Sequence, residues 1–379
     1  MADYFLFLLR TMEVIALLYA LLIFLYSVGW YLQKTNLSKN NEHSTFVSVL
    51  IAARNEELHI ESLLNDLLHQ DYPRDKFEII IADDHSNDAT AKIISTIIQE
   101  NDLVNIRLLS VNGSGKKAAL SEAILAAKGQ FILVTDADCR LHPDWISTMT
   151  EIYNQQELKI LLGPVMIEPG TGIFGKLQSL EFMSLMGSTA GSCRIGLPSM
   201  ANGANLGFDR EIALSLGKEA FKHRYASGDD IFLLHAMLKS YGTDAVGFAL
   251  HENAIVKTAA LPTLKSFMQQ RMRWVSKSRG YTRAAIIVPA VVVFFFNLAL
   301  LLLLGMSFLF PFLFPVYMLL TLFKFMIDYP LLSGVSSFTK NRQLLIWALP
   351  LEVIYPFYVV IVAVAGNFSG INWKGRKIT

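Results

Sequence analysis

Cysteine and charge are both scarce in this sequence. Its 379 residues include 2 cysteines, Cys139 and Cys193, which excludes a disulfide framework and a cysteine-rich metal site. The formal net charge is +1, so the composition gives no indication of a nucleic-acid partner. Internal repeats and low-complexity stretches are absent from the sequence as well. These absences exclude a disulfide-stabilised scaffold, a repeat protein and a nucleic-acid-binding protein.

Long hydrophobic runs take the place of charge. The chain is 53% hydrophobic and 17% charged, with a mean hydropathy of +0.40. Residues 12–33 are long enough to cross a bilayer, which takes about 20 apolar residues, and no small-residue cleavage site of a signal peptide follows them. A second block, from Ala284 to about Leu332, is long enough for two spans. A last run, residues 344–365, carries Pro350 and Pro356 and is either a third span or a bent, partly re-entrant segment.

Charges beside these runs indicate an orientation. Lys34 and Lys39 follow the first run and favour a cytoplasmic location for the globular region after it. The tail also carries basic residues, so either the positive-inside tendency fails here or one of the three later segments does not cross the membrane, and we favour the second account. The sequence thus predicts an N-terminal transmembrane anchor (1–36), a globular domain (45–260), an amphipathic interfacial helix (261–283), two or three transmembrane segments (284–366) and a basic tail (367–379).

The globular region alternates buried strands with amphipathic helices. Strands are expected at 47–51, 77–82, 106–111 and 131–134, with helical patterns after the first, second and third. This alternation predicts an α/β domain with a parallel sheet. Ligands of such sheets bind beyond the carboxyl ends of the strands. Polar residues gather just past the predicted strand ends: Arg54, Asn55, Glu56, Asp83, Asp84, Asp136 and Asp138.

Two motifs in this region have both a structural and a chemical interpretation. Asp136 and Asp138 form either a solvated turn or a pair of carboxylates that holds a divalent cation. Residues 113–117, Gly-Ser-Gly-Lys-Lys, lack the spacing of a P-loop. They form either a solvated loop or a helix start that binds a phosphate.

In this order, the motifs "VLIAARNEE", "IIIADDHSNDAT", "GSGKKAAL", "VTDAD", "GANLGFDR", "GDD" and "QQRMRW" resemble those of the membrane-attached, inverting family-2 glycosyltransferases. The resemblance covers about residues 45–281. It implies a GT-A nucleotide-sugar-binding domain, with a mostly parallel sheet, inserted between one N-terminal transmembrane helix and a C-terminal hydrophobic helical block.

The resemblance implies a donor site. Lys116 would lie near the nucleotide or its diphosphate, and Asp136 and Asp138 match the Asp-x-Asp element that holds Mg²⁺ or Mn²⁺. Asp138 would be the more direct metal ligand. The donor would be a nucleotide sugar, most commonly a uridine diphosphate sugar in this family. The expected nucleotide pocket consists of Ala52, Arg54, Asn55, Glu56, Asp83 and Asp84.

The family's catalytic base matches the "GDD" motif. Asp229 and Asp230 begin an apolar, helix-like run, so they form either an N-terminal helix cap or the base that takes the acceptor's proton. The family usually has Glu-Asp here, with the last acid as base. We therefore expect Asp230 to be the base, with Asp229 in place of the glutamate.

Two further motifs would contact the diphosphate and the acceptor. Gln270, Arg273 and Trp274 match the Gln-x-x-Arg-Trp element and would close over the diphosphate and the acceptor mouth. Gly203 and Asn205 match the family's acceptor loop. The helix around 264–281 also has the pattern of a basic interfacial helix. Its basic side chains are expected to face lipid phosphates: Lys265, Arg271, Lys277, Arg279 and Arg283.

The expected function is a metal-dependent, inverting transfer of a sugar to a lipid or lipid-linked acceptor at the cytoplasmic face of the inner membrane. The alternative is a processive polysaccharide synthase, or a catalytic subunit of one. The small number of hydrophobic segments favours single addition, because a synthase needs enough spans to form a channel. A catalytically inactive binder is disfavoured, since the metal pair, the base and the Arg-Trp pair are all present.

Overall fold

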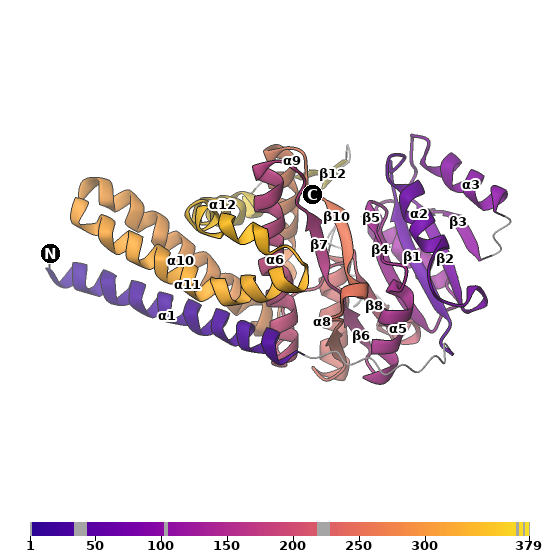
Figure 1. Ribbon diagram of the computed structural model, residues 1–379, viewed down its shortest axis with the longest axis horizontal. Coiled ribbons are helices and arrows are strands. Elements are labelled where there is room, and N and C mark those ends of the chain that lie inside the picture. The colour runs from indigo at the N-terminus through magenta and orange to yellow at the C-terminus, as the bar shows by residue number, and fades with distance from the viewer. Residues whose placement is uncertain are drawn as a thin grey trace. The chain divides into compact units, whose positions relative to one another are not determined.

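The computed structural model describes residues 2–33, 44–101, 105–217, 228–368, 371–373 and 376–378 (Figure 1). The chain divides into two units. The first, here the sheet unit, comprises residues 34–168 and 200–259. The second, the helical unit, comprises residues 1–33, 169–199 and 260–379. Residues 169–199, which the sequence assigned to the globular domain, thus group with the apolar helices.

The sheet unit has the predicted parallel sheet at its centre. Strand β1 (Val47–Ala53) lies between β2 (Phe77–Asp83) and β4 (Phe131–Asp136) and runs parallel to both. The three strands are almost entirely buried, as parallel strands covered on both faces require. Ala52 pairs with Ala82 on one side and with Asp136 on the other. The ends of these strands therefore form one edge, which carries the polar residues of the candidate site.

The remaining strands complete a mostly parallel sheet. The order is β3-β2-β1-β4-β8-β6-β9, in which β8 runs antiparallel to β4 and β6. A smaller sheet has the order β5-β10-β7. The strands not yet bounded are β3 (Ile106–Ser110), β5 (Cys139–Arg140), β6 (Ile160–Leu162), β7 (Val165–Glu168), β8 (Leu206–Asp209), β9 (Val246–Phe248) and β10 (Val256–Ala259).

Helices follow the strands of the sheet unit as predicted. After β1 comes α2, after β2 comes α3, and after β3 comes α4, which packs on β1 and β2. The bounds are α2 (Ile60–Leu68), α3 (Thr90–Glu100), α4 (Lys116–Ala126), α5 (Trp145–Gln155), α7 (Arg210–Leu216) and α8 (Asp229–Tyr241), with 3-10 helices η1 (Arg74–Lys76) and η3 (Glu252–Ala254).

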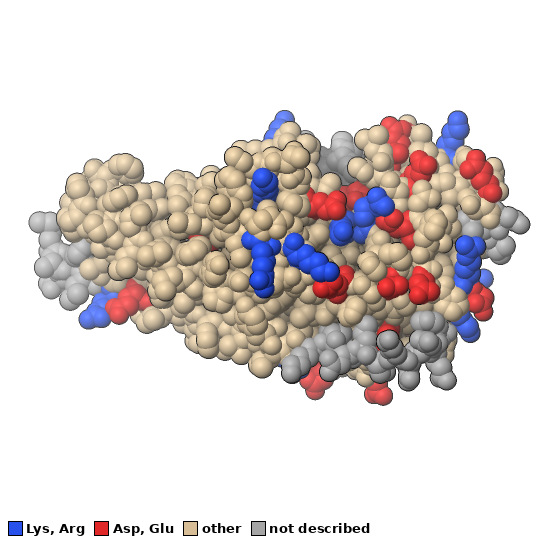
Figure 2. All heavy atoms as spheres, viewed as in Figure 1, with Lys and Arg blue, Asp and Glu red and all other residues tan. Residues whose placement is uncertain are grey.

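The helical unit is built from long apolar helices. Within the described residues, four segments are long and apolar enough to cross a membrane: 9–32, 284–309, 311–338 and 342–367. On the face seen in Figure 2, the surface over these long apolar helices is almost without charge. The elements are α1 (Ala2–Leu32), α6 (Ile173–Arg194), α9 (Leu264–Ser276), η4 (Lys277–Gly280), α10 (Ala284–Leu309), η5 (Pro311–Leu313), α11 (Phe314–Phe338), η6 (Arg342–Trp347), α12 (Ala348–Phe368), β11 (Ile371–Trp373) and β12 (Arg376–Ile378).

Helix α6 was not predicted from the sequence, and a pair of glycines explains how it packs. A Cβ added to Gly29 of α1 would lie 2.2 Å from the carbonyl oxygen of Gly191 in α6. A Cβ on Gly191 would lie 2.1 Å from the carbonyl oxygen of Tyr26. The two helix backbones therefore approach so closely that only glycine fits at the crossing.

The bundle of α1, α10 and α11 contains a buried charged cluster. Lys324 of α11 donates to Asp328 at 2.7 Å and to Glu352 of α12. Tyr19 of α1 donates to both oxygens of Asp328 at 2.8 Å. Lys324 and Glu352 are only 1% and 4% exposed. Charges in an apolar bundle are costly unless paired, and here each has a partner.

Helices α10 and α11 form an antiparallel hairpin beside α1. Tyr19, near the middle of α1, stacks on Phe296 of α10 with ring centroids 4.6 Å apart, and it donates to Asp328 of α11. The middles of α10 and α11 are therefore level with each other. It follows that the start of α10 and the end of α11 lie at the same end of the bundle.

The segment 342–367 begins and ends at that same end. It follows the end of α11, reaches the middle of the bundle where Glu352 meets Lys324, and then returns. In its last turn Gly366 packs against the backbone of Met272 in α9, and Arg279, just before α10, donates to the carbonyl of Asn367. The return places α12 beside α9, as Figure 1 also shows.

Candidate functional site

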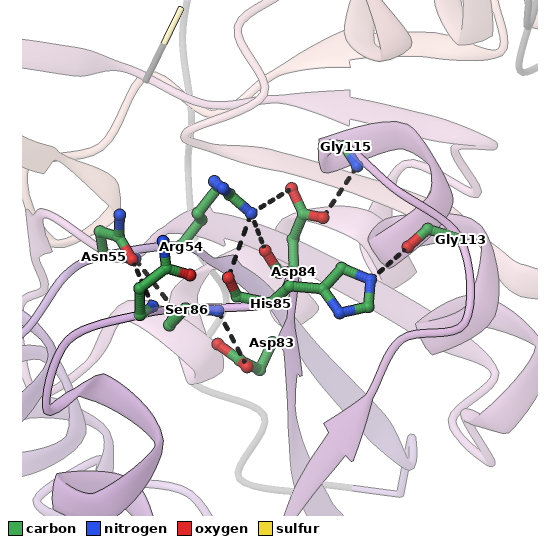
Figure 3. A network of polar contacts seen from close by, with 9 residues as sticks. Arg54, Asn55, Asp83, Asp84, His85, Ser86, Gly113 and Gly115 are labelled. Carbon is green, nitrogen blue, oxygen red and sulfur yellow. Dashed lines mark hydrogen bonds and ion pairs between the residues drawn. The ribbon is translucent and has the colours of Figure 1, made fainter. Parts of the chain in front are cut away.

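A network of polar contacts joins the ends of β1 and β2 (Figure 3). Arg54, just past β1, donates through Nη1 to the carbonyl oxygens of Asp84 at 2.5 Å and His85 at 3.2 Å. The Arg54 guanidinium also lies 4.0 Å from the Asp84 carboxylate. Asn55 accepts from the backbone N–H of Asn87 at 2.9 Å. The network brings together Arg54, Asn55 and Asp84, as the sequence predicted for this edge.

Asp83 and Asp84 differ in what their carboxylates contact. Asp84 is 2% exposed, and its Oδ1 accepts from the backbone N–H of Gly115 at 2.9 Å. Asp83 accepts from the N–H of Ser86 at 3.3 Å through Oδ2, while its buried Oδ1 has no hydrogen-bond partner among the described residues. A buried carboxylate oxygen without a donor is costly. Asp84 therefore binds the loop before α4, whereas Oδ1 of Asp83 can still accept a hydrogen bond.

Two residues of this edge adopt left-handed backbone conformations. Asn55 has φ +52° and His85 has φ +54°. Asparagine and histidine tolerate this region better than most residues. The turns are held by hydrogen bonds from Asn55 N–H to Ser86 Oγ at 3.0 Å and from Glu56 N–H to Thr90 Oγ1 at 2.8 Å. Ala52, the other predicted pocket residue, lies half-buried in β1.

The glycine-rich turn opens helix α4, as predicted. Gly115 precedes the helix with φ +94°, a conformation that suits glycine. Glu122, one of the residues that the sequence interpretation missed, accepts from the N–H groups of Gly113 at 2.9 Å and Asn112 at 3.1 Å. These bonds lower the pKa of the Glu122 carboxyl. The loop that carries Lys116 is thus fixed by Asp84 on one side and by Glu122 on the other.

Lys116, the first residue of α4, lies among carboxylates. Its ammonium donates to Asp136, the last residue of β4. Burial alone lowers the pKa of Lys116, but the carboxylate of Asp136, followed by those of Asp229 and Asp230, outweighs it and raises the pKa. Lys116 is therefore charged throughout the physiological range, and it pairs directly with Asp136.

Asp136 and Asp138 differ in their exposure to solvent. Asp136 is half-buried at the end of β4, whereas Asp138 is exposed in the two-residue turn before β5. Within the described part of the chain, no group of three or more His, Cys, Asp or Glu residues could hold a metal ion. Mg²⁺ commonly takes only one or two carboxylates and completes its shell with substrate phosphates and water. Two aspartates at the strand end fit such a partly substrate-made site.

Asp229 and Asp230 begin helix α8 after Gly228, whose φ is +97°. Asp230 accepts from the backbone N–H of Gly203 at 3.2 Å, so the predicted base and acceptor loop are in contact. Asp229 lies 4.0 Å from the ammonium of Lys117, a buried residue whose role the sequence interpretation missed. The two acids therefore have different surroundings although they are adjacent.

These residues meet beside a small pocket. A Cβ on Gly203 would lie 3.6 Å from the Lys116 Nζ and 3.8 Å from the Asp230 Cβ. Asp136, Lys116, Gly203 and Asp230 thus form one continuous cluster. The pocket below is mostly apolar, and it is lined by Leu120, Ile124, Val134, Gly203, Leu206, Phe208, Asp229, Asp230 and Leu233.

Asn205 is placed differently from Gly203. Its side chain is fully buried, accepts from Trp145 Nε1 at 3.1 Å, and donates to the carbonyls of Pro164 at 2.9 Å and Ala254 at 2.8 Å. All of these partners belong to the scaffold. The structure therefore places Asn205 beneath the loop, as a support for Gly203.

The Gln-x-x-Arg-Trp residues lie on α9 in the helical unit. Thr263 caps this helix with a capping box shared with Ser266. Gln270, Arg273 and Trp274 are all half-buried. The prediction that Arg271 faces lipid phosphates is wrong, because its guanidinium is 2% exposed and pairs with Glu181 of α6 at 2.7 Å. Phe267, Arg271 and Trp274 share one helix face, which is otherwise apolar. The position of Arg271 on this face was the sequence signal that its charge is buried against a partner.

The fold and this strand-end cluster define a class of protein. A mostly parallel sheet with an Asp-x-Asp turn after a central strand is the GT-A nucleotide-sugar-binding fold. Residues 48–214 match the family model "Glycosyl transferase family 2", and the domain in this part of the chain belongs to that family.

Curated relatives match part of the chain. A "Beta-monoglucosyldiacylglycerol synthase" of Trichormus variabilis is 32% identical over 114 residues, which cover 30% of this chain and 24% of that protein. A "Poly-beta-1,6-N-acetyl-D-glucosamine synthase" of Staphylococcus aureus is 33% identical over 142 residues, covering 37% of this chain and 34% of that protein. The matches thus span about a quarter to a third of the relatives' length.

One solved structure resembles nearly the whole chain. The mannosyltransferase PcManGT of Pyrobaculum calidifontis, in complex with GDP-Man and Mn²⁺, aligns with a TM-score of 0.60. The alignment covers 94% of this chain and 99% of that one, at 16% sequence identity. This similarity supports the fold, including its N-terminal and C-terminal apolar helices.

Proposed function

We propose that this protein transfers a sugar from a nucleotide sugar, with inversion, to a lipid or lipid-linked acceptor at the cytoplasmic face of the membrane. One observation carries the proposal. Lys116 lies between Asp136, the first acid of the Asp-x-Asp turn, and the corner formed by Gly203 and Asp230. This arrangement supports a diphosphate site at Lys116 next to Asp230 as the candidate base.

The donor half of the proposal rests on the strand-end edge. The Oδ1 of Asp83, which has no hydrogen-bond partner within the described part of the chain, is suited to accept from the imide N–H of a uracil-type base. Arg54, Asn55, Glu56 and Ala52 would complete the base pocket. The start of α4, with Lys116, would bind the diphosphate through its cation and its N-terminal N–H groups.

A divalent cation would complete the donor site. Asp138, which is exposed, would hold Mg²⁺ or Mn²⁺ with help from Asp136. When bound, the ion would neutralise the departing nucleoside diphosphate. PcManGT, the structurally similar protein, contains Mn²⁺ in its complex with GDP-Man.

The proposed reaction is a single displacement. Asp230 takes the proton from the acceptor hydroxyl, whose oxygen forms a bond to the anomeric carbon of the sugar while the bond to the diphosphate oxygen breaks. Gly203 holds the Asp230 carboxylate, and Asp229 beside it is paired with Lys117. We assign Gln270, Arg273 and Trp274 the diphosphate and acceptor roles that the family resemblance implies.

The contacts of the helical unit suggest a topology. If α1, α10 and α11 cross the membrane and 342–367 enters and leaves at one face, the basic tail returns to the side on which α1 ends. That side would be the cytoplasm, because Lys34 and the tail are both basic. This arrangement supports a cytoplasmic location for the domain of residues 45–260 and an interfacial position for 261–283.

A polysaccharide synthase is the second candidate. The similarity to the poly-β-1,6-N-acetyl-D-glucosamine synthase favours it. Against it, only four segments of the described chain are long and apolar enough to cross a membrane. Single addition to a lipid agrees better with that number and with the similarity to the glucosyldiacylglycerol synthase.

The test is release of nucleoside diphosphate by the detergent-purified protein, with Mg²⁺ or Mn²⁺, across a panel of nucleotide sugars and membrane lipids. Asp230→Asn and Asp138→Ala should abolish release, while Asp75→Asn, an exposed acid on η1, should leave it unchanged. A product one sugar heavier than the lipid indicates the proposed transferase, and a ladder indicates the synthase. Equal release by wild type and Asp230→Asn would overturn the proposal.

A further inference from the structure

Arg271 occupies the second position of Gln-x-x-Arg-Trp, between the residues that the family resemblance singles out. Its guanidinium donates through Nη2 to Glu181 of α6 at 2.7 Å. The two side chains are 3% and 4% exposed. Tyr358 of α12 donates to the other oxygen of Glu181 at 3.1 Å. One buried ion pair therefore ties α9 to α6 and α12.

The same guanidinium also contacts two residues of the motif itself. Its Cζ lies 4.2 Å from the centre of the Trp274 ring, a cation–π distance, and Nη1 donates to the side-chain oxygen of Gln270. With its oxygen held in this way, Gln270 directs its amide NH₂ group away from Arg271. Trp274 is held from a second side by Phe182, with centroids 6.1 Å apart.

We propose that Arg271, anchored by Glu181 and Tyr358, is a positioning residue that sets the orientation of Gln270 and Trp274 for the transfer reaction. The inference rests on the proposed function, since it assigns Gln270 and Trp274 a role in catalysis. Arg271 itself is buried and acts through these two neighbours.

The shape of the guanidinium is what the arrangement requires. A planar fork donates to Glu181 and Gln270 at once and presents a flat face to Trp274. A lysine at this position keeps the charge for Glu181 but cannot make all three contacts. Arg271→Lys is therefore the discriminating variant, because it preserves the buried ion pair and removes the positioning.

The kinetic experiment compares Arg271→Lys with wild type on the donor and acceptor found in the release assay. We expect kcat to fall about 10–100-fold, because small misplacements of catalytic groups cost about that much. The dissociation constant for the nucleoside diphosphate should stay within about twofold. Tyr358→Phe, which removes only the hydroxyl that holds Glu181, should lower kcat less. Gln269→Ala, an exposed neighbour on α9, should match wild type.

A double-variant cycle separates positioning from a merely structural role. If Arg271 acts through Gln270 and Trp274, Arg271→Lys should cost clearly less kcat in a Trp274→Phe background than in the wild type, since only the part through Gln270 remains. Additive losses in kcat, or a wild-type kcat for Arg271→Lys, would overturn the inference. If Arg271→Lys fails to fold, the same cycle is measured with Tyr358→Phe.

An optical measurement keeps this inference distinct from the proposed function. The emission of Trp274, taken as the difference between wild type and Trp274→Phe, should shift in Arg271→Lys, because a cation no longer stacks on the indole. An active wild type with an unshifted Trp274 emission would count against the positioning role alone. A shifted emission in a protein that releases no nucleoside diphosphate would instead count against the proposed function alone.

Discussion

Asp84 accepts a hydrogen bond from the backbone N–H of Gly115 at 2.9 Å, which links the end of β2 to the first turn of α4. Through this bond, the loop before Lys116 is tied to the edge of the sheet. Asp83, the preceding residue, makes no such link and keeps a buried oxygen without a partner among the described residues. Adjacent carboxylates of one motif thus differ: Asp84 holds the loop, whereas Asp83 is the one to which we assign a role in binding.

The first prediction separates these two tasks. Asp84→Asn should lower the free energy of unfolding by about 1–3 kcal/mol, since a buried, hydrogen-bonded acceptor beside Arg54 loses its charge. Asp83→Asn should leave the stability nearly unchanged and weaken binding of uridine diphosphate by about 10–100-fold, as expected for a hydrogen bond to a charged group. Denaturant titration and calorimetric binding measure the two effects. The reverse pattern would contradict the assignment.

The second prediction concerns Lys116 and the cation site. In the proposed cation site, Lys116 would compete with the metal ion for the carboxylate of Asp136, and both side chains are partly exposed, at 26% and 35%. Lys116→Met should therefore tighten Mn²⁺ binding to the nucleotide-free protein about three- to tenfold, in line with the modest strength of partly exposed ion pairs.

Manganese titration followed by electron paramagnetic resonance measures this change. Lys128→Met, a second lysine of the sheet unit, serves as the matched control and should leave Mn²⁺ binding unchanged. Weaker Mn²⁺ binding in Lys116→Met would show that the ion does not share Asp136 with Lys116.

The third prediction is a pH dependence at the glycine-rich turn. Hydrogen bonds from Gly113 and Asn112 lower the pKa of Glu122 in the folded protein. The folded-state pKa of Glu122 lies below the unfolded value of about 4.3. The ionised Glu122 therefore stabilises the folded turn fully at pH values above that unfolded value. This stabilisation is lost as the pH falls through the folded-state pKa.

Amide hydrogen exchange at Gly113 measures the effect. Protection relative to the unstructured rate should decrease below about pH 4 in the wild type, since that lies below the unfolded pKa. Glu122→Gln should show weak protection with no such dependence. Glu61→Gln, an exposed acid in the first turn of α2, should behave as the wild type. An unchanged pH dependence in Glu122→Gln would assign it to another group.

The sequence predicted the sheet well because its signals are local. The strands β1, β2 and β4 are short apolar runs that end in aspartate or arginine motifs, and parallel strands covered on both faces have this pattern. The glycine turn before α4 was equally visible. The antiparallel strand β8 was missed, since its position between β4 and β6 depends on pairing across distant parts of the chain.

Contacts between residues far apart in the sequence also explain why helix α6 and the burial of Arg271 were not predicted. Helix α6 has no amphipathic pattern, because neighbours contact it on several sides: α1 contacts Gly191, Val335 of α11 contacts Gly187, and Arg271 of α9 contacts Glu181. Arg271 was assigned to a lipid-facing surface because its partner lies 90 positions away. The Gln-x-x-Arg-Trp motif itself was recognisable, but the residue that holds it was not.

The fourth prediction concerns the charged cluster in the bundle. Lys324 is the cation between two acids, Asp328 and Glu352, on two helices. Lys324→Met should destabilise the bundle by about 3–5 kcal/mol, because it leaves buried carboxylates without their counter-charge. Lys324→Met combined with Glu352→Met should recover a large part of that loss, since an apolar pair of similar volume needs no compensation.

Unfolding in detergent, followed by denaturant titration, measures the two variants, with Lys265→Met as an exposed control on α9. If the double variant is as unstable as the single one, the lysine contributes something other than charge compensation. Lys324 also lies over the rings of Tyr19 at 5.4 Å and Tyr355 at 4.8 Å, so the cation holds α1 and α12 as well as the acids. The recovery therefore measures what the unpaired Glu352 costs, and the remaining loss combines the unpaired Asp328 with the contacts to the two tyrosine rings.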